Sequence, residues 1–487
     1  MANSSRASLV DSFDQTLSEI LRPLATNADN SLSTPSGIAI AYSGGLDSTA
    51  LLHLAHDYAH RHAIVLHAFH VHHGLSEHAD AWLAHCCTQA TALGVAFDSC
   101  HITVASNSPD GIESSARSGR YAALGALCRK HAVPLLLTGH HQDDQAETVL
   151  LQLLRGSGVA GLSGMDLANH APALLGDATC LMGRPLLAFS RAALQEFVQE
   201  CGLEHIDDPS NLDPRYARNA LRHSVMPVLE ATFPGFAERF ARSARHAQSA
   251  QRLLIDLARQ DLEDCADGDG LAVDRLRRLS LARCDNLLRY WFGSRGMRMP
   301  SSAWLQEMRE QVLGAKADAQ ILVGHADCDI HRHRNRIVMT ARSALPDPEQ
   351  APRLFMWNGT PAMHFTEFGG TLYFEPRQFG LDAAWLRRQE LAIQWRSPGW
   401  RLKLAANRST RSLKYHYQAA HVPAWERPRL PLVTLGSELL FAAGIGMDCR
   451  HLVVDAAKND VREKIVLRWQ ADPRASSSSA PVGQQFL

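Results

Sequence analysis

The chain has 487 residues, more than one hydrophobic core usually organises, so two or three domains are expected. Hydrophobic residues make up 46% and charged residues 20%, which excludes a mostly disordered, collagen-like or coiled-coil protein. Lys plus Arg total 49 against 50 for Asp plus Glu, so no global charge draws the chain to nucleic acid or anionic lipid. Any site for a polyanion has to be local.

The N-terminal segment and the cysteines restrict the protein class further. The opening MANSSRASLVDSFDQTL has no basic start followed by an apolar stretch, and no later segment approaches the roughly 20 apolar residues of a membrane-spanning helix. We therefore expect a cytoplasmic protein that contacts no membrane. The ten cysteines include no CxxC pair, which argues against a zinc ribbon or a thioredoxin-type motif.

Strands and helices alternate in the first half of the chain. Residues 1–35 predict a leading helix, from apolar positions at helical spacing over 11–24, and a Ser/Asn/Pro-rich connector. From residue 36 to 225, apolar strands such as IAIAYS, IVLHAFHV and VPLLLTG alternate with helices. Continuous apolar strands separated by helices are typical of βαβ units, so this segment predicts an α/β domain with a parallel sheet covered on both faces.

The second half of the chain changes character twice. Helical patterns dominate residues 226–342 and predict a small helical domain. Residues 343–354 hold three prolines and predict a linker. Strand-like runs (GGTLYFEP, LAIQWR, LPLVTLG and ELLFAAG) then predict a β-containing C-terminal domain over 355–470, followed by a disordered tail over 471–487.

A six-residue motif follows the first apolar strand and opens a helix. Glycines there let a backbone nest and the helix N-terminus approach a phosphate closely. The spacing is neither that of a Walker P-loop nor that of a dinucleotide fold. If the motif binds ATP, Asp47 would also hold Mg²⁺. The alternative to an ATP site is an ordinary turn in which this Asp caps the helix. The predicted ATP-binding residues are Ser43, Gly44, Gly45, Leu46, Asp47 and Ser48.

This motif resembles the nucleotide loop of PP-loop ATP pyrophosphatases, which cut ATP between the α and β phosphates. Four further motifs follow in order: HVHHGL, IESSARSGRYAAL, TGHHQDDQAETVLLQLLRGSGVAGLSGM, and RPLLAFSR with DDPSNLDPRYARNALR. Together they resemble the tRNA(Ile)-lysidine synthetase family over most of residues 37–230. The resemblance implies an adenine nucleotide α hydrolase-like fold. It also implies a ligase that uses ATP, Mg²⁺ and L-lysine on the wobble cytidine of tRNA(Ile), through an adenylated intermediate. The same resemblance implies that the helical domain over residues 226–342 binds tRNA or substrate.

Two acids in the third motif are candidates for recognising lysine. Asp144 and Glu147 are three residues apart at the start of a helix, near the carboxyl end of a strand where α/β sheets bind ligands. Paired carboxylates suit a cationic ligand, and the resemblance implies that these two bind lysine. The alternative is that they only favour the helix macrodipole.

Histidines and arginines near the same motifs remain candidates with structural alternatives. His140 and His141 end a strand and would contact the nucleotide or the reacting base, or would serve only in packing. Arg117 and Arg120 share a helix face that suits phosphate. We predict that Arg117 contacts the nucleotide and that Arg120 contacts tRNA. The alternative is that both belong to a solvated basic face. Arg218 and Arg222 lead into a helix and are predicted to contact tRNA or pyrophosphate.

A basic, aromatic segment supplies the local polyanion site. Between residues 396 and 429 eight basic residues stand against one acid, with tryptophans and tyrosines interleaved. This composition predicts a surface for the tRNA backbone and for base stacking, which includes Arg408, Arg411 and Lys414. A basic face over core aromatics is the alternative.

Rival functions differ in what they require. A tRNA 2-thiolation enzyme would ordinarily need paired cysteines, and a small-molecule synthetase would not need the basic segment. A catalytically inactive tRNA-binding protein would not need both SGGLDS and DDQAE. The sequence leaves the oligomeric state open, a homodimer included.

Overall fold

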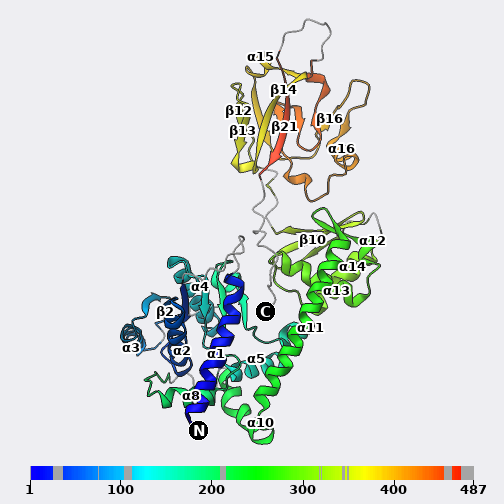
Figure 1. Ribbon diagram of the computed structural model, residues 1–487. Helices are drawn as coiled ribbons and strands as arrows, with labels where there is room; N and C mark the ends of the chain where they lie inside the picture. Colours follow the sequence, from blue (N-terminus) through cyan, green and yellow to red (C-terminus); the bar gives the residue numbers. More distant parts are fainter. Residues whose placement is uncertain are drawn as a thin grey trace. The chain divides into compact units, whose positions relative to one another are not determined.

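The protein is described from a computed structural model that covers residues 2–25, 37–74, 76–103, 112–208, 215, 217–316, 319, 321–342, 346–347, 350–453 and 463–472. The chain divides into two compact units (Figure 1). One runs to Glu263 and includes Asn286–Ser294, and the other holds Asp264–Asp285 and continues from Arg295. The connector before residue 36, parts of the predicted linker and most of the predicted C-terminal tail lie outside the described residues.

The first unit is built on a six-stranded sheet in the order β3-β2-β1-β4-β6-β5. Its first five strands in this order are parallel, and only β5 runs antiparallel, against β6. The predicted parallel sheet is thus confirmed, with one antiparallel strand at its edge. The strands are β1 (Gly37–Ala41), β2 (Val65–His72), β3 (Ala96–His101), β4 (Leu135–Leu137), β5 (Ala168–His170) and β6 (Leu181–Gly183).

Helices cover both faces of this sheet, as the apolar strands predict. On one face, Ile38 and Ile40 pack with α1 (Ala2–Ala25), α2 (Leu46–His62) and α8 (Arg191–Glu200). On the other, Ala39 and Leu136 pack with α4 (Ile112–Lys130) and α7 (Pro172–Leu175). Successive strand residues therefore face opposite cores.

α3 (Ala79–Ala92), between β2 and β3, packs Cys86 and Ala90 into the same core as Ile38. The other helical elements are α5 (Gln142–Leu154), α6 (Val159–Leu162), α9 (Ala217–Ala220), the π-helical turn η2 (Leu221–Val225), α10 (Met226–Thr232) and α11 (Phe236–Cys265). Because α5 follows β4, its first turn lies at the carboxyl ends of the parallel strands, where α/β folds bind ligands.

The middle region is helical, as predicted for residues 226–342, and it also contains a sheet that was not predicted. The predicted helices are present as α10, α11, α13 (Leu281–Ser294) and α14 (Ser302–Gly314). The sheet has five antiparallel strands in the order β7-β8-β11-β10-β9. The short helix α12 (Val273–Leu276) follows β8, and the strands are β7 (Ala266–Asp267), β8 (Gly270–Ala272), β9 (Ile321–Gly324), β10 (Cys328–His333) and β11 (Arg336–Ala341).

One buried arginine explains why that sheet is hard to see in the sequence. Strand β10 reads CDIHRH, so its polar residues hide the apolar alternation of a half-buried strand. Arg332 is nevertheless buried, and its Nη1 donates to the carbonyls of Val312 and Ala315 at the end of α14. Tertiary hydrogen bonds thus allow a charged residue at a core position.

The C-terminal region is rich in strands, as predicted. A five-stranded sheet has the order β12-β15-β18-β19-β20, and a three-stranded sheet the order β13-β14-β21. Their apolar residues form one core, which includes Phe374, Leu391 and Leu440. The strands are β12 (Arg353–Met356), β13 (Ala362–Phe365), β14 (Gly370–Asp382), β15 (Glu390–Gln394), β18 (Leu432–Leu435), β19 (Glu438–Ala442), β20 (Gly446–Met447) and β21 (Lys464–Ala471).

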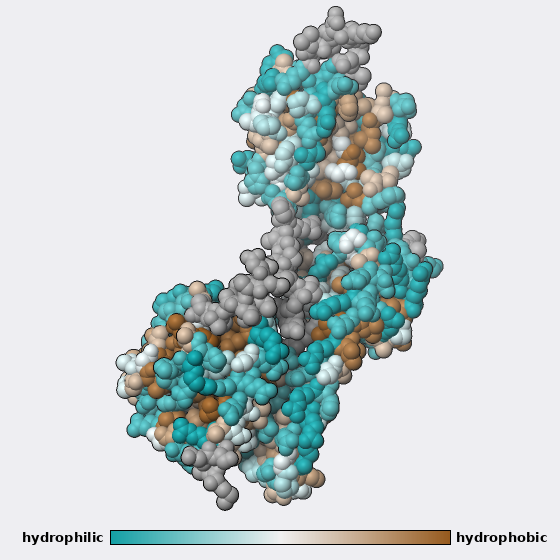
Figure 2. All heavy atoms as spheres, in the orientation of Figure 1, coloured by the Kyte–Doolittle hydropathy of each residue, from teal (hydrophilic) through white to brown (hydrophobic). Residues whose placement is uncertain are grey.

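The visible surface of both units is mainly hydrophilic, with hydrophobic residues in scattered groups (Figure 2). Among the described residues, no helix is long and apolar enough to cross a membrane. The domain boundaries drawn from the sequence stay predictions.

Candidate active site

The SGGLDS motif forms a tight turn between β1 and α2. Gly45 is the N-cap residue of α2 and no side chain caps it, so Asp47 lies in the first turn and is not the cap. The hydroxyl oxygens of Ser43 and Ser48 lie 3.1 Å apart. The free backbone N–H groups of this turn and the helix N-terminus together suit a phosphate.

The turn requires glycine for both conformation and space. Gly44 has φ +82°, and a Cβ there would lie 2.5 Å from Cδ1 of Ile206 and 2.9 Å from Sγ of Cys86. The Ile206 N–H also donates to the Gly44 carbonyl at 2.9 Å. A segment about 160 residues downstream in the chain thus packs against the turn and holds its shape.

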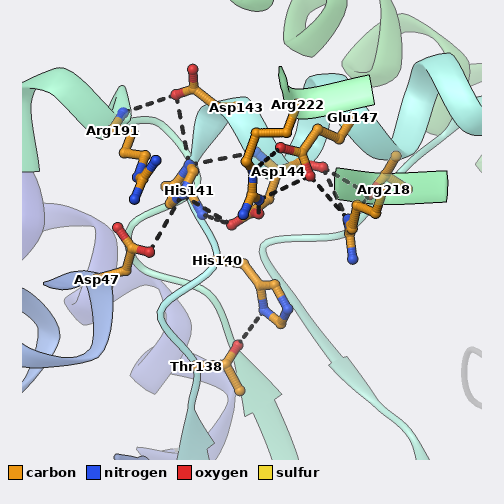
Figure 3. Close-up of polar contacts among 11 residues, drawn as sticks. Asp47, Thr138, His140, His141, Asp143, Asp144, Glu147, Arg191, Arg218 and Arg222 are labelled. Atoms are coloured by element: carbon orange, nitrogen blue, oxygen red, sulfur yellow. Dashed lines mark hydrogen bonds and ion pairs between the residues drawn. The ribbon is translucent and has the colours of Figure 1, made fainter. Parts of the chain in front are cut away.

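The two predicted lysine-binding acids lie together on α5, and each is paired with arginine (Figure 3). Arg222 donates from Nε to Oε1 of Glu147 at 2.7 Å and from Nη2 to Oδ1 of Asp144 at 3.1 Å. Arg218 donates from Nε to Oε2 of Glu147 at 3.0 Å. The arginines predicted to contact tRNA therefore neutralise the acids predicted to contact lysine.

The acids differ in how far they are open to a ligand. The Glu147 side chain is 1% exposed and accepts hydrogen bonds from both arginines. The Asp144 side chain is 14% exposed, and its Oδ2 accepts from the His141 backbone N–H at 3.1 Å. Burial raises the pKa of Asp144, but the nearby charges of His141 and Arg218 lower it by more, so the net pKa is below its usual range. Asp144 is thus an ionised carboxylate with an accessible edge.

His141 connects the nucleotide turn with the acid pair. It is the N-cap residue of α5, and its Nε2 lies 3.3 Å from Oδ2 of Asp144 and 3.7 Å from Oδ2 of Asp47. Burial lowers the pKa of His141, but the carboxylates of Asp143 and Asp47 raise it to about 10. The Asp144 N–H lies 3.4 Å from Nδ1 of His141, and Oδ2 of Asp143 lies 3.6 Å from the same atom. A neutral ring can accept from the Asp144 N–H at Nδ1, whereas a cationic ring donates from Nδ1 toward Asp143.

His140 has a different environment, although it is the next residue. Its Nδ1 lies 2.8 Å from Oγ1 of Thr138 (Figure 3). Burial lowers the pKa of His140 to about 3, and the charges of Arg184, Arg117 and Arg218 act in the same direction. At neutral pH this ring is therefore uncharged and lies among cations.

The predicted basic face of α4 lies at the same edge of the sheet. Arg117 and Arg120 are both exposed, and the Arg117 guanidinium lies 5.2 Å from the centre of the Tyr121 ring. The charge of Arg120 acts on His73, just beyond the end of β2. Both arginines thus lie near the carboxyl edge, where an anion would approach.

The basic C-terminal segment separates into surface and core residues. Arg408, Arg411 and Lys414 are exposed, and Arg411 lies over the ring of exposed Tyr415 at 5.4 Å. These four lie around the short strand β17 (Arg411–Ser412) and the helix α16 (Leu413–Ala419). Two members of the same segment are structural, since Arg427 is buried against the Val422 carbonyl and Tyr417 is buried against that of Ala443.

Two residues near the site were not assigned from the sequence. Asp143 contacts His141 and accepts from the Arg191 backbone N–H at 2.8 Å. Arg184 lies at the carboxyl end of β6 and is 7% exposed. Arg184 could have been predicted from its position directly after a strand, in RPLLAFSR. Asp143 could have been predicted from the two adjacent acids in DDQAE.

Three family models match the chain, in the order in which its regions occur. A PP-loop domain matches residues 12–229, a TilS substrate binding domain matches residues 271–338, and a TilS substrate C-terminal domain matches residues 391–469.

Curated relatives match the chain over most of its length. A tRNA(Ile)-lysidine synthase of Burkholderia pseudomallei is 41% identical over 442 residues, which cover 84% of this chain and 89% of the relative. The tRNA(Ile)-lysidine synthase of Ralstonia nicotianae is 40% identical over 421 residues, with the same coverage of 84% and 89%. That of Aromatoleum aromaticum is 40% identical over 412 residues, covering 84% of this chain and 93% of the relative.

Proposed function

The chain belongs to the tRNA(Ile)-lysidine synthase family, and from this membership we propose how its residues divide the work of forming lysidine. The protein is an ATP-dependent ligase that forms lysidine at the wobble position of a tRNA. The finer proposal is that L-lysine is joined to C2 of the wobble cytidine of tRNA(Ile) through an adenylated tRNA. One observation carries it: the nucleotide turn and the acid pair meet at a single imidazole, that of His141.

In the first step, O2 of the cytidine attacks the α-phosphate of ATP, and pyrophosphate leaves. The turn from Ser43 to Ser48 holds the phosphates through its backbone N–H groups and the N-terminus of α2. The protein contributes mainly position and charge stabilisation. The cationic His141 adds positive charge beside Asp47 and thereby limits the repulsion between that carboxylate and the phosphates.

The residues of the turn fit a magnesium ion. Oδ1 of Asp47 is buried and has no hydrogen-bond partner among the described residues. A carboxylate oxygen of this kind, together with phosphate oxygens, is the ligand set that Mg²⁺ prefers. When bound there, the ion would supply positive charge that stabilises the leaving pyrophosphate.

In the second step, the ε-amine of lysine attacks C2 of the activated cytidine, and AMP leaves. We propose that the more exposed Asp144 contacts the ammonium group that is held, in place of its bond from Arg222. The buried Glu147 keeps Arg218 and Arg222 in position and adds negative charge. A held ammonium leaves the other amine free to react.

We further propose a division of labour along the chain. Residues 36–225 form the catalytic domain, and residues 226–342 and 355–470 bind tRNA. Exposed Arg408, Arg411, Lys414 and Tyr415 support a phosphate and stacking surface in the last of these. Arg117 and Arg120 support a second anion contact at the carboxyl edge of the catalytic sheet.

The test incubates the protein with labelled lysine, ATP, Mg²⁺ and unmodified tRNA(Ile). We expect lysine in the tRNA only when ATP is present, and pyrophosphate release in step with it. The same tRNA with uridine in place of the wobble cytidine is the control and should accept no lysine. ATP cleavage without incorporation would contradict the proposal.

A further inference from the structure

A buried guanidinium near the carboxyl edge of the catalytic sheet has one unused donor. Arg184 is 7% exposed, and its Nε has no hydrogen-bond partner among the described residues. Its Nη1 donates to the Asp166 carbonyl and to Oδ1 of Asn169, both at 2.7 Å. Both acceptors are neutral, and the nearby Asp166 carboxylate balances part of the charge.

The backbone of Arg184 lies beside β4, and the hydrogen bonds from its Nη1 reach the segment that holds β5. Gly183 pairs with Leu137, and the Thr138 N–H donates to the Gly183 carbonyl at 2.9 Å. Arg184 therefore follows β6 directly beside the end of β4, which leads to His140 and then to Asp144 on α5. Paired strands lie about 4.8 Å apart, so the backbone of Arg184 lies close to the segment that leads to His140, and the charges of both Asp144 and Arg184 act on the His140 ring.

Two other features make this region a receptor for an anion. The charges of Arg184 and Arg117 both act on His140, which places the two arginines around its ring. Burial is the main reason that the pKa of Arg184 is lowered, and the charge of Arg117 acts in the same direction, while the charge of Asp166 opposes them. A buried cation with an unused donor is stabilised by an incoming oxyanion.

We propose that Arg184, assisted by Arg117, binds the α-carboxylate of the substrate lysine. This inference rests on the proposed function and names the part of lysine that the site holds. An amino acid carries its α-ammonium and α-carboxylate two bonds apart, so its receptor needs both signs of charge side by side. Asp144 supplies one and Arg184 the other, which leaves the ε-amine to extend toward the cytidine.

Position and depth favour the carboxylate over a phosphate. The nucleotide turn follows β1, on the other side of β4, so the phosphates that it holds lie away from β6. A guanidinium buried to this degree suits the end of a small molecule better than a phosphodiester flanked by two nucleosides. The orphaned donor is thus matched in charge and in size by an amino-acid carboxylate.

The first test uses the unaltered enzyme with lysine and with lysinamide, which keeps both amines and lacks the negative charge. Because a charged hydrogen bond is lost, we expect the KM for lysinamide to be about ten- to a hundredfold higher. Equal use of the two compounds would overturn the proposal. If the unaltered enzyme incorporates no lysine at all, the proposed function itself fails, which separates the two questions.

The second test changes Arg184→Gln and measures the two steps separately. We expect the KM for lysine to rise about ten- to a hundredfold and the preference over lysinamide to disappear. Adenylation of tRNA without lysine should stay within about twofold of the unaltered enzyme, since the nucleotide turn is untouched. Arg61→Gln, at the exposed C-terminal end of α2 and paired with Asp14, is the matched control and should change neither step.

Other results for these variants would give Arg184 or Arg117 a different role. Slower adenylation or a raised KM for ATP, with an unchanged KM for lysine, would assign Arg184 to a phosphate and overturn the proposal. If Arg184→Gln does not fold, Arg117→Gln is measured in its place, with a smaller loss of the same preference expected. An unchanged preference in a folded Arg117→Gln enzyme would remove Arg117 from the site.

Discussion

Arg222 holds the Glu147 carboxylate with two hydrogen bonds, from Nε to Oε1 at 2.7 Å and from Nη2 to Oε2 at 3.0 Å. The two residues are 75 positions apart, and Glu147 is almost completely buried. The acid pair is therefore a preassembled ionic cluster into which lysine has to fit. Such a cluster keeps both carboxylates oriented before the substrate arrives.

The pairing of Arg222 with Glu147 predicts a large loss of stability when one partner is removed. Arg222→Met should lower the free energy of unfolding by about 2–4 kcal/mol, because a buried carboxylate loses its main counter-ion. Urea unfolding measures this difference. Arg242→Met, which removes the exposed partner of Glu238, should cost no more than about 1 kcal/mol. Equal effects of the two changes would contradict the role given to Arg222.

Asp144→Asn should separate the two steps of the reaction. We expect lysine incorporation to be lost, because the neutral amide no longer attracts an ammonium group, while adenylation of tRNA is largely retained. Labelled AMP transferred to tRNA in the absence of lysine measures the first step. Loss of both steps would show that Asp144 serves the metal ion or ATP.

Gly44→Ala should damage the nucleotide turn in two ways. The φ of +82° costs about 1 kcal/mol for alanine, and the contacts with Ile206 and Cys86 add about 1–3 kcal/mol of overpacking. We expect a fall in the free energy of unfolding of about 2–4 kcal/mol, together with loss of adenylation. Gly94→Ala is the control, since φ is +67° there but no atom lies within 4 Å of the added Cβ. It should cost about 1 kcal/mol and leave adenylation intact.

Asp98 predicts a defined dependence of stability on pH. Burial raises the pKa of Asp98, but hydrogen bonds from His131, Lys130 and the Ser99 N–H lower it to about 2, below the ordinary 3.8. Its contribution is therefore complete above pH 3.8 and is lost as the pH falls toward 2.

The change Asp98→Asn tests this dependence. It should lower the free energy of unfolding by about 1–2 kcal/mol at pH 5, allowing for solvent screening. The difference from the unaltered protein should shrink as the pH falls from 3.8 to 2, as measured by urea unfolding at each pH. Exposed Asp256→Asn is the control, and a difference that stays constant with pH would contradict the assignment.

Substitutions in the basic C-terminal segment should have two different effects, one on tRNA binding and one on stability. Arg411→Gln with Lys414→Gln should raise the KM for tRNA without changing that for ATP, because both side chains are exposed. Each lost phosphate contact should also reduce the slope of log affinity against log salt by about 1. Arg427→Gln should instead lower stability, because its guanidinium is buried against the Val422 carbonyl. A uniform effect of all three changes on the tRNA affinity would contradict this division.

The sequence alone determined the features that short segments encode. SGGLDS needs only a glycine turn between a strand and a helix, and the three-residue spacing of Asp144 and Glu147 places both on one face of α5. Alternation of apolar strands with helices was enough for the parallel sheet, because the period of the pattern reports local geometry. Each of these patterns lies within a short segment of the chain. The order of the motifs along the chain then indicated the family.

Only the tertiary structure decided how charges distant in the chain are paired. Arg218 and Arg222 neutralise the acid pair, Arg427 belongs to the core, and Arg184 is buried with an unused donor. The sheet of the middle region belongs here too, because buried Arg332 makes one of its strands look exposed. The physical reason is the same in each case. The cost of burying a charge depends on the partner that packing brings to it, and no local pattern in the sequence names that partner.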